Sequence, residues 1–464
     1  MAHSPGHSSL SWFVAVFWTP TPQPADAGTL SGNPSKMSSP EEDRAVCEGP
    51  KPVGRWLMLI GPGLAVAATG VGAGDLLAAM LAGAGFRETL LWVIVIGAGL
   101  KLALNEGVAR WQLATDTTLI EGWGAHLGRA FQIGFLLYLV VWSFIVAAGL
   151  MSACGVAAHA LVPGIGIGPW GVLHSVAALI LVWFGRYHRF ETTMKALIAL
   201  MVLTLLASVI LVGPDLARVL RGFFVPELPA GSASTVLSLM GGIGGSVTML
   251  SYGYWIREKG WNGRTWLTTV RRDLGVGYLL IAIFGAAMLI LAATALLGLG
   301  GMPAGSQGLV ACADALEKGA AVRFGETIAQ GARLTFLIGL WAAVFTSTLG
   351  VWQGVPYLFA DFTQQWRGRT RVIDEDAWTY RGYLLYLALP PMVLLVLDRP
   401  VWVIKLYTLT GGLFMPVLAA SLLWLTTKRS LMGDLKTGWL SFAAMIAALA
   451  LFAVIAIRQI VDLV

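Results

Sequence analysis

Long apolar runs are the feature that most constrains what this chain can fold into. From Trp56 onward, stretches of about 20 mostly apolar residues alternate with short polar connections, and a helix of about 20 apolar residues spans a bilayer. Hydrophobic residues make up 57% of the chain and charged residues only 12%, whereas roughly a quarter of a soluble domain is charged. The composition therefore excludes a soluble enzyme, a fibrous protein and a disordered chain.

The apolar runs predict an all-α membrane protein with eleven spanning helices. Residues 1–50 are rich in Pro, Ser, Gly and His and are expected to form a disordered N-terminal tail, and residues 51–464 the membrane domain. The Pro390-Pro391 pair should kink the ninth span. The expected spans are 56–82, 89–112, 130–160, 169–185, 190–213, 235–257, 273–299, 333–360, 379–397, 400–427 and 437–458.

The distribution of Lys and Arg predicts the orientation in the membrane. With the N-terminus inside, 21 of the 31 basic residues fall in inside segments and 8 in outside segments, while Lys101 and Lys405 lie within spans. This bias predicts a multi-pass cell-membrane protein with a cytoplasmic N-terminus and an external C-terminus. The net charge of +6 follows from this topology. The expected partner is therefore the lipid bilayer, and no nucleic-acid partner is expected.

Spans one and six carry clusters of glycine at corresponding positions, residues 61–75 and 240–253. Glycine costs about 1 kcal/mol relative to alanine within a helix, and unwound backbone survives at membrane depth only where it is buried in protein or lines a cavity. Such interruptions in two matching spans are typical of a transporter binding site. They predict inverted repeats of spans 1–5 and 6–10, with span eleven appended. Close helix packing through small residues is the alternative.

Asp75 is the only acidic residue of span one. A carboxylate in a membrane-spanning helix costs about 2.5–3.5 kcal/mol on insertion scales, so a functional partner is expected. Asp75 could also cap the second half of a broken helix, and the two roles are compatible. Span two contains Lys101 and Glu106, which could pair with each other or with Asp75, or the lysine could snorkel toward the interface.

Two other functional classes use comparable residues. The Gly-x-Gly-Asp pattern at residues 72–75 occurs in intramembrane aspartyl proteases, but these enzymes share a proton between two carboxylates. Their second aspartate follows a tyrosine, and this chain contains no Tyr-Asp pair; an enzyme is therefore not expected. An amino-acid or sodium-coupled carrier would also use broken helices, with half-helix N-termini binding the substrate carboxylate. Asp75 would repel that carboxylate and favours a cation as substrate.

The segment 61–121 resembles the first two helices of the Nramp (natural-resistance-associated macrophage protein) family of divalent-metal transporters. Shared features are the opening Gly-Pro-Gly at residues 61–63, the interrupted helix, and the sequences at residues 89–92 and 113–115. The resemblance extends over about residues 55–460. It implies a LeuT-like fold and transport of Mn²⁺ or Fe²⁺, usually with protons, and no cofactor apart from the transported ion.

The chain departs from the family at functional positions. The family's helix-one Asp-Pro-Gly-Asn reads Gly-Ala-Gly-Asp at residues 72–75, and its helix-six Met-Pro-His reads Thr-Met-Leu at 248–250. Ser143 and Val146 stand about where helix three usually carries acidic residues of the proton path. These differences resemble the Nramp-related magnesium transporter branch. They imply transport of Mg²⁺, and also Mn²⁺, without tight proton coupling; a proton-coupled Mn²⁺/Fe²⁺ transporter is the alternative.

The expected metal site is built from oxygen ligands. Asp75 and the Thr248 hydroxyl suit Mg²⁺, Ca²⁺ or Mn²⁺, whereas a thioether would select softer metals. Mg²⁺ typically keeps several waters and uses one or two carboxylates. The resemblance adds the backbone carbonyls of Thr69 and Gly245 as ligands, and Thr408 in span ten. The full set of expected metal-site residues is Asp75, Thr69, Gly72, Gly245, Thr248 and Thr408.

Overall fold

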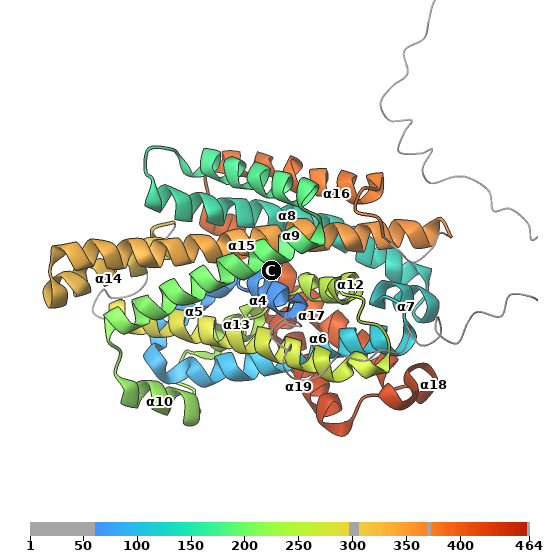
Figure 1. Ribbon diagram of the computed structural model, residues 1–464. Coiled ribbons are helices and arrows are strands. Elements are labelled where there is room, and N and C mark those ends of the chain that lie inside the picture. Colours follow the sequence, from blue (N-terminus) through green and yellow to red (C-terminus); the bar gives the residue numbers. More distant parts are fainter. Residues whose placement is uncertain (1–60, 297–305, 369–372, 462–464) are drawn as a thin grey trace, which may run out of the picture. The chain divides into compact units, whose positions relative to one another are not determined.

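The computed structural model describes residues 61–296, 306–368 and 373–461, and every regular element in this part of the chain is a helix (Figure 1). The predicted N-terminal tail lies outside the described residues. The principal helices are α4 (Pro62–Gly70), α5 (Ala73–Phe86), α6 (Leu91–Thr115), α7 (Leu119–His126), α8 (Arg129–Leu161), α9 (Ile167–Val212), α10 (Leu216–Phe224), α11 (Ala233–Gly242), α12 (Ser251–Glu258), α13 (Leu267–Ala295), α14 (Ser306–Phe324), α15 (Glu326–Trp366), α16 (Trp378–Ala388), α17 (Pro400–Thr426), α18 (Arg429–Met432) and α19 (Trp439–Val461).

Ten segments of the described residues are long and apolar enough to cross a membrane. One of them, Ala73–Thr115, joins α5 to α6 through the 3₁₀ turn η1 (Arg87–Leu90). It therefore contains the second half of predicted span one together with span two. The other nine segments correspond to predicted spans three to eleven. The all-helical membrane architecture expected from the sequence is confirmed.

The short connection expected between spans four and five, residues 186–189, is helical, and both spans are long and apolar enough to cross a membrane. α9 continues from Ile167 to Val212 and bends near its middle (Figure 1). These four residues include no proline, so no backbone donor is lost and helical hydrogen bonding continues. The expected kink of span nine is present, because α16 ends at Ala388 and the 3₁₀ helix η4 (Pro390–Leu397) follows.

Asp273 holds the beginning of α4. It is buried in α13. Its carboxylate accepts hydrogen bonds from Gly61 N at 3.1 Å, Gly63 N at 2.6 Å and the Tyr252 hydroxyl at 2.9 Å. The first amides of a helix lack partners within that helix, and a negative charge at this end is favourable. Asp273 thus joins α4 and α12, the first half of broken span one and the second half of broken span six, to α13.

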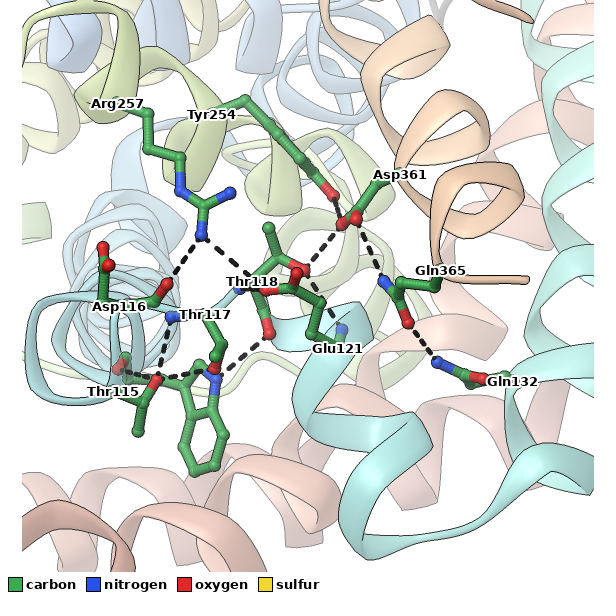
Figure 2. Close-up of polar contacts among 11 residues, drawn as sticks. Thr115, Asp116, Thr117, Thr118, Glu121, Gln132, Tyr254, Arg257, Asp361 and Gln365 are labelled. Carbon is green, nitrogen blue, oxygen red and sulfur yellow. Dashed lines mark hydrogen bonds and ion pairs between the residues drawn. The ribbon is translucent and has the colours of Figure 1, made fainter. Parts of the chain in front are cut away.

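A second buried carboxylate, Asp361 of α15, joins α7 and α12 (Figure 2). It accepts hydrogen bonds from Thr118 Oγ1 and the Tyr254 hydroxyl, both at 2.6 Å, and from Gln365 Nε2 at 3.0 Å. Gln132 of α8 extends the network by donating to Gln365 Oε1 at 2.7 Å. The second half of broken span six is therefore anchored by polar contacts to helices on two sides.

Candidate functional site

Spans one and six are both interrupted, as their glycine clusters predict. Span one breaks between α4 and α5 at Val71 and Gly72, and span six breaks after α11, before the 3₁₀ turn η2 (Val247–Leu250) leads into α12. Gly244 and Gly245 have φ angles of +88° and +74°, a region that glycine adopts without steric cost. A Cβ on Gly70 would lie 3.0 Å from the carbonyl carbon of Gly244. The glycines therefore serve both predicted purposes: they permit the breaks, and they bring the two breaks into contact.

A cavity of about 50 Å³ lies between the two breaks. All six residues predicted from the sequence line it, and they come from the two broken spans and α17. Asp75 is the one acidic side chain among the lining residues, and no Cys, Met or His is among them. Their part as ligands stays a prediction. The six are Thr69, Gly72, Asp75, Gly245, Thr248 and Thr408.

Asp75 lies in the first turn of α5 and performs the capping role that the sequence allowed. Its Oδ2 accepts a hydrogen bond from Gly72 N at 3.0 Å. An ionised carboxylate has about four acceptor positions, so this bond leaves capacity to bind a cation. Capping and cation binding are therefore compatible in this geometry.

The two carbonyls expected to be ligands already accept hydrogen bonds. The Ser347 hydroxyl donates to Thr69 O at 2.7 Å, and Lys101 Nζ donates to Gly245 O, also at 2.7 Å. Each carbonyl oxygen has two lone pairs, so it can accept one further interaction. Thr408 Oγ1 donates to Ile404 O at 3.0 Å, which leaves the oxygen of that hydroxyl able to face a cation.

Lys101 is fully buried, and it neither snorkels nor pairs with Glu106. Its ammonium donates to the carbonyls of Gly241 at 2.8 Å, Gly242 at 3.4 Å and Gly245 at 2.7 Å. Glu106 instead pairs with Arg110 at 3.1 Å and Arg271 at 2.9 Å. The charges of Lys101 and Asp75 interact electrostatically. Of the two partners that the sequence suggested for Lys101, Glu106 is therefore excluded and Asp75 remains.

The sequence analysis missed several lining residues, among them Ser347 of α15 and Tyr407 of α17. The Tyr407 hydroxyl accepts a hydrogen bond from Gly74 N at 2.8 Å and therefore contacts the first turn of α5. Neither residue stands out in the sequence, because hydroxyl side chains are common in membrane helices and carry no charge. Tyr407 could have been suspected only from its position next to Thr408.

The chemistry of the cavity is that of a weakly charged oxygen site. Within residues 61–296, 306–368 and 373–461, no group of three or more His, Cys, Asp or Glu side chains could hold a metal ion. A cation in the cavity would meet one carboxylate, together with neutral hydroxyl and carbonyl oxygens. Hard, partly hydrated ions accept such donors.

Two interrupted spans surrounding a small polar cavity are the architecture of the LeuT-like fold. Solved structures share this fold. A manganese transporter of Eremococcus coleocola aligns with a TM-score of 0.69 at 18% identity, covering 89% of this chain and 88% of its own. MhsT, solved in complex with L-phenylalanine, aligns with a TM-score of 0.52 at 14% identity, covering 87% of this chain and 98% of its own.

The family profile described as "Natural resistance-associated macrophage protein-like" matches residues 63–462, and the chain therefore belongs to the Nramp family. A divalent metal cation transporter, MntH, of Latilactobacillus sakei is 30% identical over 219 residues, which are 46% of this chain and 47% of that protein. Metal transporter Nramp3 of Oryza sativa is 29% identical over 187 residues, 39% of this chain and 34% of its own. These matches span about half or less of each curated relative.

Proposed function

We propose that this protein is a secondary transporter or uniporter that moves divalent metal cations, Mg²⁺ and also Mn²⁺, across the cell membrane by alternating access. The observation that carries the proposal is the cavity of about 50 Å³ between the two breaks, with Asp75 as its one acidic lining residue. A cavity needs about 10–15 Å³ to hold one water, so this one accommodates an ion with a few waters. The names of the curated relatives, which are metal transporters, support the same reading.

The donor set supports a hard ion. Thr248 lines the cavity at the position where the resemblance places a methionine ligand, so no thioether is available. Oxygen donors suit Mg²⁺ and Mn²⁺ and give no particular advantage to the softer metals. Mg²⁺ also keeps part of its hydration shell when bound, which fits a cavity larger than a bare ion. These donors therefore fit Mg²⁺ as well as Mn²⁺ and give Mn²⁺ little advantage.

The second candidate on the same fold is an amino-acid or sodium-coupled carrier. MhsT, which shares the fold, was solved with L-phenylalanine, so the fold alone does not decide the class of substrate. Pockets for organic ligands typically enclose about 300–1,000 Å³, far more than the 50 Å³ found between the breaks. Asp75 would moreover repel the carboxylate of an amino acid. Both observations favour a metal cation.

Transport without tight proton coupling is part of the proposal. No acidic residue lies in 130–158 of α8. Ser143 is hydrogen-bonded to the Tyr383 hydroxyl at 2.7 Å, and Val146 lines the cavity. Neither side chain is an acid that could carry a proton at neutral pH.

We also place the N-terminus in the cytoplasm and the C-terminus outside, because of the distribution of basic residues.

The direct test is transport by the purified full chain in liposomes that contain Mg²⁺- and Mn²⁺-sensitive dyes and a pH dye. We expect uptake of both ions down their gradients, with an internal pH that stays constant. Protein-free liposomes provide the baseline. Uptake of neither ion would contradict the proposed function, whereas acidification that scales with metal uptake would support the proton-coupled Mn²⁺/Fe²⁺ alternative.

Selectivity should respond to Thr248. We expect Thr248→Met to shift preference toward Mn²⁺ and Cd²⁺ and to weaken Mg²⁺ uptake, because a thioether favours softer metals. The measurement is competition by each ion against Mg²⁺ uptake. Thr248→Val is the matched control, because it removes the hydroxyl without adding sulfur and should lower Mg²⁺ uptake with no gain in Cd²⁺ competition. An unchanged order of competition in the methionine variant would show that Thr248 does not face the ion. If the wild type transports Mn²⁺ and ignores a large excess of Mg²⁺, the Mg²⁺ assignment is wrong.

A further inference from the structure

Metal transport alone does not explain why Lys101 lies buried beside the cavity. A fully buried ammonium lies at the break of span six, although charged groups at this depth are costly. Its Nζ donates to three carbonyl oxygens, those of Gly241, Gly242 and Gly245, at 2.7 to 3.4 Å. An ammonium has three donors, so all of its hydrogen-bonding capacity is satisfied by this one stretch of backbone.

These carbonyls are favourable partners for any cation. The last carbonyls of a helix have no partner within that helix, and the C-terminal end of a helix carries partial negative charge. α11 ends at Gly242, so Gly241 and Gly242 supply such carbonyls. Gly245 adds one from the unwound segment. The end of α11 together with Gly245 therefore forms a cation-binding group of oxygens, and Lys101 occupies it.

The same oxygens belong to the transport cavity. Gly241, Gly242 and Gly245 all line it, and Asp75 lines it from the opposite broken span. The ammonium and the carboxylate interact electrostatically. Lys101 is not itself a lining residue, but its ammonium is bonded to the Gly245 carbonyl of the cavity wall, and its charge partly offsets that of Asp75.

We propose that Lys101 is a tethered cation that lowers the affinity of the cavity for divalent ions. It occupies one lone pair of the Gly245 carbonyl and partly balances the charge of Asp75, and its own positive charge repels an entering ion. The inference rests on the proposed function, since it concerns the affinity of that site. A weakly binding site releases its ion readily, which suits a transporter that handles an ion at high concentration.

The test is the binding of Mn²⁺ to purified full-length protein by isothermal titration calorimetry. Lys101→Met keeps the length and apolar stem of the side chain and removes the charge. We expect it to bind Mn²⁺ at least about tenfold more tightly than the wild type, because repulsion between buried like charges is weakly screened. Lys405→Met is the matched control: it removes the same charge from an exposed position of α17 and should leave the affinity within about twofold.

The outcomes separate this inference from the proposed function. Tighter binding by Lys101→Met supports the inference, because a merely structural lysine would lower the affinity when removed. If the wild type binds Mn²⁺ and a folded Lys101→Met protein binds it equally or more weakly, the inference is overturned and the proposed function stands. Absence of Mn²⁺ binding and of Mg²⁺ and Mn²⁺ uptake in all variants overturns the proposed function as well. If Lys101→Met does not fold, Lys101→Gln, which retains a donor for one carbonyl, takes its place under the same criteria.

Discussion

Asp75→Asn is expected to lower divalent-cation uptake at least about 100-fold, the effect of losing roughly 3 kcal/mol of charge-assisted interaction. Asp75 is the one acidic residue that lines the cavity, so the substitution removes the only negative side chain available to the ion. The amide oxygen of Asn can still accept the hydrogen bond that Asp75 accepts from Gly72 N. The start of α5 should therefore persist, and the loss of transport should reflect the missing charge.

Mg²⁺ and Mn²⁺ uptake into liposomes measures this effect, with reconstituted protein quantified in each preparation. Asp434→Asn is a suitable control, because Asp434 is an exposed partner of Arg264 and exposed ion pairs contribute little to stability. A second variant, Asp75→Asn with Lys101→Met, avoids leaving a buried ammonium without its counter-charge, and it should also fail to transport. Near-normal uptake by well-folded Asp75→Asn protein would show that Asp75 is only a helix cap.

Asp273→Ala is expected to destabilise the protein by about 3 kcal/mol or more. The buried carboxylate accepts hydrogen bonds from Gly61 N, Gly63 N and the Tyr252 hydroxyl, and a hydrogen bond to a charged group contributes about 1.5–3 kcal/mol. Alanine would leave these three buried donors without an acceptor. Because these donors lie at the start of α4 and in α12, the first half of span one and the second half of span six should detach from α13.

Thermal unfolding in detergent, followed by loss of the monodisperse peak on size exclusion, measures this change. Tyr252→Phe is the matched comparison, since it removes one of the three donors and leaves the carboxylate in place, at an expected cost of about 1–2 kcal/mol. Asp273→Asn should fall between the two. If Asp273→Ala melts within about one degree of the wild type, which corresponds to well under 1 kcal/mol, the carboxylate does not hold α4 in place.

The sequence predicted what depends on local composition. Apolar runs indicate helices wherever they occur. The short connection expected at residues 186–189 is helical, because basic residues without proline can end a span or continue a helix. Glycine clusters indicate weak points in a helix for the same local reason, and both breaks lie within them. The six expected site residues line one cavity, since positions at matching breaks in repeated halves converge in a LeuT-like fold.

The partners of the buried charges were decided only by the tertiary structure. Lys101 meets Gly245, 144 positions away, and Asp273 meets Gly61, 212 positions away. No periodicity or motif encodes such pairs, because backbone amides and carbonyls are present at nearly every residue and their availability depends on where a helix ends. A charged residue in an apolar span therefore indicates that a partner must lie nearby in the fold. Which carbonyl or amide supplies that partner is settled by how the broken halves pack against their neighbours.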